Sequence, residues 1–406
     1  MHERTAQEIH DLTIRLEGIF IKLCQLVGAR SDLLPEPYTR ILGRFHDAVP
    51  PRPFNELLHG IESSLGRSIN EVFAEVDRTP LAAASLAQVH RARLHDGSDV
   101  VIKVQYPEVA KLVRSDLIGL KRISKLALKR SSFIDAGGVI DEMNHFLNLE
   151  LDFCTEATST MRVRRAFEND ERVRVPRVHG EYTDRKLLVL EYLDGIPLTD
   201  VERMRREGVD LEQYAKTLGD VYATMFFDQG FFHGDPHPGN LLAMPGGVIG
   251  MLDFGLAKEL PDQFGAQMIA MMAKTFSGDT EGALDAARAL GFNLDELNPA
   301  LLEKIVKETM GGARQAGDAW QRGERAAWER QSRGMPSREE IAEYRAQADE
   351  YRSLVKGGKP IHIPHHFALI GRAMGLLQGI SDRLVPGEEV IQKSLLRRMI
   401  PNQRFT

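Results

Sequence analysis

The sequence predicts an α+β fold of two lobes with a helical extension at the N-terminus, and three observations support this. Two strand-like runs, residues 89–94 and 100–104, are joined by Asp96-Gly97, a dipeptide typical of hairpin turns. Apolar residues at helical spacing dominate the chain after Gln263. A length of 406 residues is enough for two lobes with a substantial core. We therefore expect a small lobe built on a sheet with helices, followed by a helical lobe.

The remaining elements follow from the same periodicities. We expect a helical extension over 1–75, a first lobe over 76–193, and a second lobe with a helical C-terminal region over 194–406. The highly charged stretch 311–358 is expected at the surface. Apolar spacing predicts helices over 6–27, 54–65, 112–128, 135–167 and 211–228, and strands over 174–179, 186–192, 241–243 and 248–252.

Composition narrows the classes of function. A net charge of −6 provides no overall attraction to nucleic acid, so we expect no nucleic-acid partner. Two cysteines, Cys24 and Cys154, cannot form a disulfide framework, which favours a reducing, cytoplasmic setting. No apolar run reaches the roughly 20 residues of a membrane span, and the best candidate, 367–380, is interrupted by Arg372. The basic helix around 111–130 leaves a peripheral contact with anionic lipid open, beside the favoured alternative of a solvated face.

The motif with the most chemical content is the run His233–Asn240, followed by Asp253-Phe254-Gly255. Phosphoryl-transfer sites use one Asp to orient or deprotonate a nucleophile, and an Asn and a further Asp to hold magnesium. Asp235, Asn240 and Asp253 fill these three places. Each alone fits a turn or loop residue equally well, but their joint order and spacing favour function. Their oxygen atoms are the ligands that Mg²⁺ prefers.

The two histidines of this run flank Asp235 at positions 233 and 237. Their spacing resembles that of a helical metal site. Prolines at 236 and 238 preclude the helix that such a site needs, so we expect structural, hydrogen-bonding roles for both.

A second candidate constellation centres on Lys103, in the predicted strand 100–104. A lysine in that place reaches nucleotide phosphates when a helix carboxylate holds it. Glu150, Asp152 and Glu156 are the candidate partners, and Asp152 and Glu156 lie one helical turn apart and share a face. The alternative is a solvated strand lysine and an acidic solvated helix face.

Three features separate this site from a standard protein kinase. Position 234 is Gly where kinases have Arg, and no A-P-E string follows Asp253. No glycine lies between Thr79 and His95, where the glycine-rich loop would be. The Ala-rich run 81–88 is therefore expected to be stiffer and more helical than a glycine loop.

From about residue 20 to 257, these motifs resemble those of the UbiB/AarF family of atypical kinases, which is linked to ubiquinone and other isoprenoid-lipid metabolism. The resemblance implies a bilobal protein-kinase-like fold. Glu150-Leu151-Asp152 resembles the family's E-x-D motif, and Glu156 occupies the place of the glutamate that pairs with the lysine. The implied ATP-binding set is Ala82, Ala83, Ala84 and Ser85 (with Gln88-Val89-His90 following), Lys103, Glu156, Glu191 and Leu193.

The N-terminal string Lys22-Leu23-Cys24-Gln25 resembles the family's K-x-G-Q motif. In the family this helix lies across the place where a peptide would dock, and its lysine meets the E-x-D acids. The resemblance therefore implies an occluding role for Lys22 and Gln25, with Lys22 paired to Glu150 and Asp152. Cys24 departs from the pattern: a side chain there either loosens the helix or fills a gap.

The resemblance implies ATP and Mg²⁺ as cofactors, Asp235 and Lys103 as catalytic residues, and Asn240 and Asp253 as metal ligands. We expect a magnesium-dependent ATPase or a phosphotransferase acting on a small or lipid-associated molecule, in isoprenoid-quinone or lipid metabolism. The expected partners are an adenine nucleotide and an isoprenoid or lipid molecule; the acceptor and the oligomeric state stay open. The alternatives are an aminoglycoside- or choline-kinase-type enzyme, a nucleotide-sensing scaffold without turnover, and, third, a protein kinase.

Overall fold

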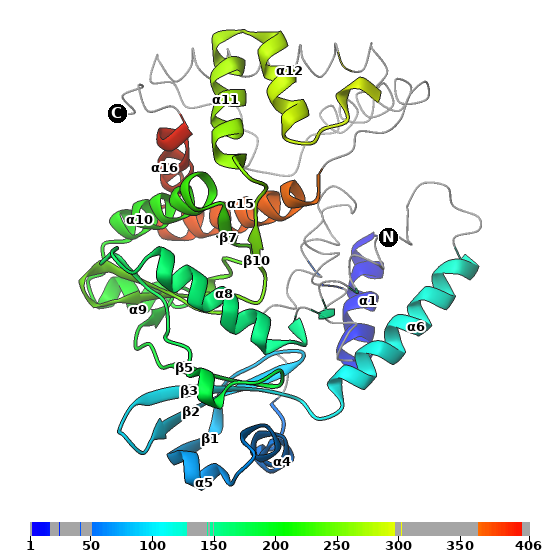
Figure 1. Ribbon diagram of the computed structural model, residues 1–406, viewed down its shortest axis with the longest axis vertical. Coiled ribbons are helices and arrows are strands. Elements are labelled where there is room, and N and C mark those ends of the chain that lie inside the picture. Colours follow the sequence, from blue (N-terminus) through cyan, green and yellow to red (C-terminus); the bar gives the residue numbers. More distant parts are fainter. Residues whose placement is uncertain are drawn as a thin grey trace. The chain divides into compact units, whose positions relative to one another are not determined.

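A computed structural model of the chain describes residues 2–16, 51–127, 150–296 and 364–399, together with residues 24, 41, 144, 147, 148 and 302 (Figure 1). The chain forms two compact units. The first comprises Met1–Arg203 and His237–Ala257, and the second comprises Met204–Pro236 and Lys258–Thr406. The predicted boundaries at residues 75 and 193 stay predictions.

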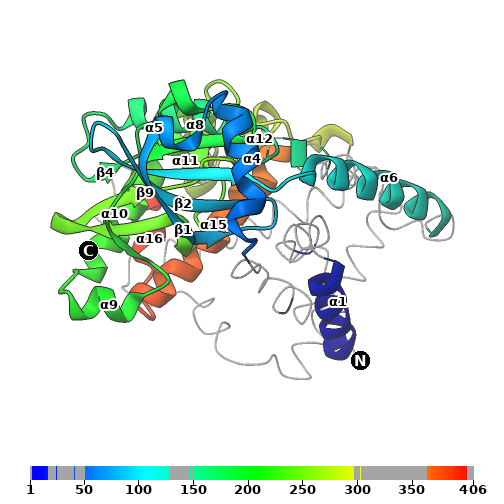
Figure 2. The ribbon, with the colours of Figure 1, turned by 90° about the horizontal axis from the view of Figure 1, so that it is seen from below.

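The first unit contains an antiparallel sheet in the order β1-β2-β3-β5. Its turn between β2 and β3 has Gly97 at φ 88°, a conformation that glycine adopts without strain, and this confirms the predicted hairpin. Helix α4 packs on this sheet (Figure 2). Its residues Leu57 and Ile61 are fully buried in one core with Ile102 of β3. The elements are α4 (Phe54–Leu65), α5 (Ile69–Val72), β1 (Phe73–Ala83), β2 (Ala87–Leu94), β3 (Asp99–Gln105) and β5 (Leu187–Glu191).

The Ala-rich run is not helical, so the expectation of a helical loop is wrong. Strand β1 continues to Ala83, and a short connection leads into β2 at Ala87. The N–H of Ala84 donates to the carbonyl of Ala87 at 2.8 Å, which closes the connection tightly. Pairing with β2 satisfies the backbone of this run, and that outweighs the helix preference of alanine.

The predicted helix over 135–167 is wrong as one continuous helix. The chain turns at Leu151 and Asp152, and α8 (Phe153–Ala166) begins afresh. Asp152 is its N-cap, with a carboxylate that accepts the N–H of Cys154 at 3.1 Å. The side chain of Gln105 donates to the carbonyls of Leu151 and Arg185, which fixes this turn against the sheet. Helices α1 (His2–Leu16) and α6 (Val109–Ala127) also belong to this unit.

A second sheet of the first unit has the order β4-β9-β8-β6. The predicted hairpin is confirmed: β8 and β9 pair across the turn Pro245–Gly247. The predicted strand 174–179 is shorter than expected, because Pro176 has no N–H to donate and Val178 makes only an isolated bridge. The elements are β4 (Val173–Arg174), η3 (Gly180–Tyr182), β6 (Ile196–Pro197), η5 (Pro238–Asn240), β8 (Leu241–Met244), η6 (Pro245–Gly247) and β9 (Val248–Met251).

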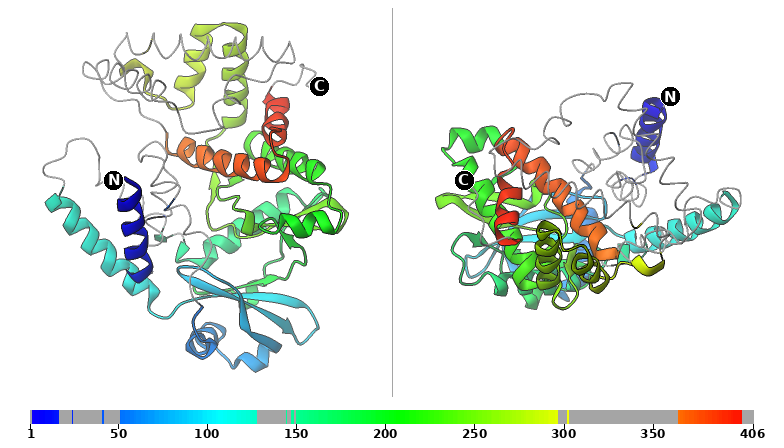
Figure 3. Two further views of the ribbon diagram at one scale, coloured as in Figure 1. Left: turned by 180° about the vertical axis from the view of Figure 1, so that it is seen from behind. Right: turned by 90° about the horizontal axis from the view of Figure 1, so that it is seen from above.

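The described residues of the second unit lie mainly in helices. Helix α10 contributes the fully buried Leu218 and Tyr222, and α15 and α16 pack against it (Figure 3). Among the described residues, no helix is long and apolar enough to cross a membrane, and 311–358 lies outside them. The elements are α10 (Leu211–Thr224), the π-helical η4 (Met225–Gln229), β7 (Phe231–His233), α11 (Phe264–Ser277), α12 (Thr280–Ala289), η7 (Leu294–Glu296), α15 (His365–Leu384) and α16 (Val390–Met399). Two further elements, α9 (Val201–Arg206) and β10 (Ala257–Glu259), have residues in both units.

Gly265 permits a close approach of α11 to η4 in the second unit. A Cβ at this position of α11 would lie 2.3 Å from the carbonyl oxygen of Phe227 and 2.7 Å from its Cα. Backbone atoms cannot yield as a flexible side chain can, so we expect Gly265→Ala to lower the free energy of unfolding by about 2–3 kcal/mol. The control is Gly371→Ala in α15, where nothing lies within 4 Å and alanine is the better helix former. Equal urea midpoints for the two variants would contradict this packing.

Candidate functional site

The candidate site of the first unit is built around Lys103, in the middle of β3. Its neighbours in the strand, Ile102 and Val104, point into the core beneath α4. Because side chains alternate along a strand, Lys103 points to the other face, where α8 packs. Its Nζ lies 5.3 Å from the centre of the Phe153 ring, and its side chain is 15% exposed.

Two carboxylates from distant parts of the sequence hold this lysine. Lys103 Nζ donates to both Glu156 oxygens at 2.8 Å and to Asp253 Oδ2 at 3.0 Å. Glu156 lies in the first turn of α8, where the helix dipole favours a negative charge. The structure therefore brings together one cation and two anions in a largely buried place.

This arrangement perturbs the titration of both buried partners. Burial raises the pKa of Glu156 to about 7, and the nearby negative charge of Asp253 adds to this effect against the opposing attraction of Lys103. Burial acts against the charge of Lys103, but Asp253 and Glu156 together hold the pKa of the ammonium above its ordinary value. Lys103 is therefore charged, and Glu156 gains a proton more readily than an ordinary glutamate.

Asp253 presents the exposed side of this cluster. Its side chain is 44% exposed, whereas that of Glu156 is 5% exposed. The residue adopts a left-handed conformation at φ 52°, and its Oδ1 accepts the N–H of Gly255 at 3.1 Å. A Cβ on Gly255 would lie 3.3 Å from that oxygen, so a glycine suits this turn. One carboxylate oxygen thus serves the turn while the other meets Lys103.

Asn240 ends the short helix η5 and lies beside the same turn. The N–H of Leu252 donates to the carbonyl of Asn240 at 2.8 Å. The hairpin β8–β9 therefore returns the chain so that Asp253 follows directly after a residue bonded to Asn240.

Asp235 belongs to the second unit, just after β7. Its N–H donates to Nδ1 of His233 at 3.4 Å, and its Oδ1 accepts from Nη2 of Arg372 at 3.0 Å. His237 Nδ1 accepts the N–H of Gly239 at 3.2 Å, so both histidines bond to backbone, as expected. Sequence reasoning missed the contact of Arg372, because a residue 137 positions away carries no local signal of it.

The other predicted nucleotide-binding residues lie at the end of β1, in the connection from β1 to β2, and at or just after the end of β5. Ala82 and Ala83 end β1, and Ala84 and Ser85 form the connection to β2, with Ala82 and Ala84 exposed. Leu193 is buried. Glu191 ends β5, and its side chain accepts from Arg174 and from the N–H of Arg177.

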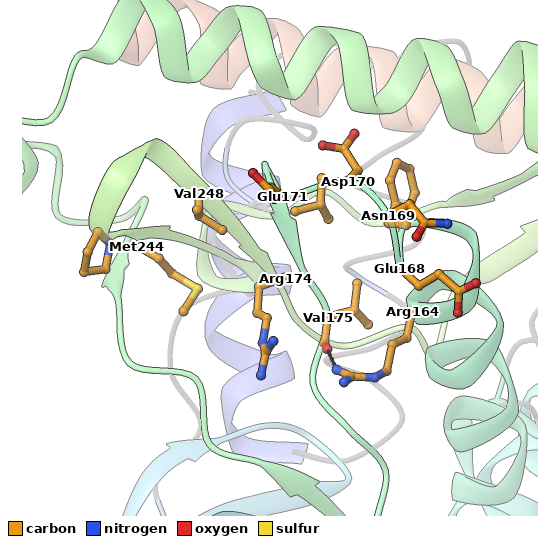
Figure 4. A pocket seen from close by; sticks show the side chains of 12 residues that line it. Arg164, Glu168, Asn169, Asp170, Glu171, Arg174, Val175, Met244 and Val248 are labelled. Carbon is orange, nitrogen blue, oxygen red and sulfur yellow. Dashed lines mark hydrogen bonds between the residues drawn. The ribbon is translucent and has the colours of Figure 1, made fainter.

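A cavity of about 680 Å³ lies in the first unit (Figure 4). Arg164 and Arg174 line it, and both contact Glu191. Figure 4 also shows the hydrogen bond from Arg164 to the carbonyl of Val175, at 2.6 Å. Neither Lys103 nor Asp253 lines this cavity, so it is separate from the Lys103 cluster. Its lining residues are Arg164, Phe167, Glu168, Asn169, Asp170, Glu171, Val173, Arg174, Val175, Met244, Pro245 and Val248.

The predicted occluding residues are only partly described. Lys22 and Gln25 lie outside the described residues. Asp152 caps α8 and pairs with Arg185 at 3.1 Å, and the charge of Glu150 contributes to the raised pKa of Glu156. Cys24 is 6% exposed, with its sulfur 3.2 Å from the hydroxyl of Thr13. Its side chain therefore fills a buried position.

The raised pKa of Glu156 predicts a pH dependence of stability. The pKa rises from an ordinary 4.5 to about 7 on folding, so the folded protein binds more protons than the unfolded chain between these values. The contribution of Glu156 to stability is then present at low pH and is lost as the pH rises through about 7, by up to about 1.4 kcal/mol per pH unit. Urea unfolding at pH 5, 6 and 7 should show a steeper decline for the wild type than for Glu156→Gln. An equal decline of the free energy of unfolding with pH in the two proteins would contradict the raised pKa of Glu156.

Both the fold and the sequence of this chain match known proteins. A solved structure described as "The complex structure of Rv3197-erythromycin from Mycobacterium tuberculosis" matches with a TM-score of 0.60 at 23% identity, over 95% of this chain and 96% of that one. This likeness supports the fold, an α+β kinase-like fold as predicted. The model of the ABC1 atypical kinase-like domain matches residues 44–287. The chain belongs to this family, and the predicted UbiB/AarF membership is confirmed.

Two relatives illustrate the range of the family. "AarF domain-containing protein kinase 1" of Xenopus laevis is 31% identical over 95% of this chain and 72% of its own length. "Protein ACTIVITY OF BC1 COMPLEX KINASE 7, chloroplastic" of Arabidopsis thaliana is 38% identical over 63% of this chain but only 37% of its own length.

Proposed function

We propose that this chain binds an adenine nucleotide with Mg²⁺ and transfers the γ-phosphoryl group to water or to a small, lipid-associated acceptor. The observation that carries the proposal is the contact of Lys103 with both Glu156 and Asp253. A strand lysine held by a helix glutamate beside a D-F-G aspartate is the arrangement that positions nucleotide phosphates in kinases. Membership of the atypical kinase-like family agrees with this.

The residues present fit the two cofactors. Asp253 offers a half-exposed carboxylate, and Asn240, whose backbone carbonyl bonds to the residue before Asp253, offers a side-chain amide; both are hard oxygen donors. In kinase sites the remaining magnesium ligands are phosphate oxygens and water, so two protein ligands suffice. Mg²⁺, when bound, would supply positive charge against the phosphates. Lys103 would add a second positive charge, which Glu156 holds in place.

Asp235 would orient the acceptor in this proposal. Phosphoryl transfer needs little proton removal early, so an oriented carboxylate can act by aligning a hydroxyl or a water molecule. The absence of an arginine at 234 and of an A-P-E string argues against a protein acceptor.

We also propose that the chain acts in isoprenoid-quinone or lipid metabolism, and this proposal rests on the family resemblance. Helix α6 adds support, because Leu112 and Ile118 are each 54% exposed on a helix that also exposes Lys111 and Arg114. Apolar and basic side chains together suit a peripheral contact with an anionic lipid surface.

The experiment is phosphate release from ATP, with Mg²⁺ or with EDTA, in the presence of anionic liposomes, zwitterionic liposomes or a quinone-like head group. We expect release only with Mg²⁺, and a rise with anionic liposomes or the head group. A rate of phosphate release that is the same with and without each lipid would overturn the proposed role in lipid metabolism. Nucleotide binding without any turnover would favour the scaffold, and transfer to an aminoglycoside or to choline would favour the small-molecule kinase.

A further inference from the structure

Arg372 of α15 forms an ion pair with Asp235, the aspartate of the proposed phosphoryl-transfer motif. The Nη2–Oδ1 distance is 3.0 Å, and the side chains are 11% and 18% exposed. A carboxylate this far removed from water is strongly disfavoured unless a positive charge or hydrogen bonds compensate it. The guanidinium fulfils that need with a fixed planar geometry.

Both partners are held by the packing of the second unit. Ala373, Leu377 and Ile380 anchor α15, with exposures of 0%, 0% and 2%. On the other side, the hydroxyl of the fully buried Tyr222 donates to the carbonyl of His233 at 3.2 Å, which fixes the end of β7. The N–H of Asp235 in turn bonds to the His233 ring. The carboxylate is therefore constrained through its own backbone and through α15.

We propose that Arg372 is a positioning residue for Asp235, and that α15 is part of the catalytic scaffold although it lies beyond residues 44–287, which the family model matches. The inference rests on the proposed function, in which Asp235 orients the acceptor. A residue that acts by orienting a catalytic group affects turnover more than nucleotide binding.

The test compares Arg372→Met, Arg372→Lys and the control Arg383→Met, which removes an exposed arginine from the same helix. With Mg²⁺ and ATP, Arg372→Met should lower kcat by about 100-fold with little change in KM. Arg372→Lys should recover part of kcat because it keeps the charge, and Arg383→Met should match the wild type. An unchanged kcat in Arg372→Met, or an equal loss in Arg383→Met, would overturn the inference.

Thermal unfolding supplies a readout that does not depend on turnover. Arg372→Met removes the guanidinium that lies 3.0 Å from the largely buried Asp235, so its Tm should fall, and adding Asp235→Asn in the same chain should restore part of that loss. Strictly additive Tm changes would overturn the ion pair even if the single variant proves too unstable to assay. A wild type without turnover would overturn the proposed function and the role of Arg372 together, whereas an active wild type matched by Arg372→Met would overturn the role of Arg372 alone.

Discussion

Asp253→Asn should abolish magnesium-dependent phosphate release from ATP. The activity falls because an amide has no charge to hold Mg²⁺, a loss of about 4 kcal/mol, which corresponds to about 1,000-fold in rate. Asparagine tolerates the left-handed conformation of this position, so the turn itself should persist.

Asp262→Asn, at an exposed position, is the matched control and should leave turnover unchanged. Full turnover in Asp253→Asn would contradict the site.

Lys103→Met should cause the largest loss of stability among substitutions in the site. Without the ammonium, Glu156 and Asp253 are left facing each other with Glu156 buried, and removing one partner of a buried ion pair costs about 3 kcal/mol or more. Protonation of Glu156 relieves this, so the loss measured by urea unfolding should be smaller at pH 6 than at pH 8. Turnover should be lost at either pH.

Lys186→Met is the control for this experiment, because it removes an exposed lysine from the same unit. It should change the free energy of unfolding by less than about 0.5 kcal/mol at both pH values. A pH-independent loss in Lys103→Met, of the same size as in this control, would mean that the lysine is a solvated strand residue.

Local patterns in the sequence were sufficient for the parts of the fold that depend on local interactions. The Asp96-Gly97 turn and the alternation around Lys103 predicted the hairpin that carries the lysine. The spacing of Leu57 and Ile61 predicted α4, and Pro245-Gly246-Gly247 predicted the hairpin that leads to Asp253. Each of these signals lies within a few residues of the structure it determines.

The features that the sequence did not reveal depend on contacts with distant parts of the chain. Alanine favours a helix in isolation, but Ala82 and Ala83 pair with β2 and become a strand. The break at Asp152 depends on Gln105, which bonds to the carbonyl of Leu151 from the end of β3. Arg372 read as a charge that interrupts an apolar run, and only the packing of α15 brings it to Asp235.

The most direct test of the central claim is the equilibrium binding of a non-hydrolysable ATP analogue, titrated with and without Mg²⁺ into the wild type and Asp253→Asn. If Lys103, Glu156 and Asp253 form a magnesium–nucleotide site, Mg²⁺ should strengthen binding to the wild type by about tenfold or more, about 1.4 kcal/mol. Asp253→Asn should keep the magnesium-free affinity and lose the response to Mg²⁺. Equal responses to Mg²⁺ in the two proteins would contradict the account.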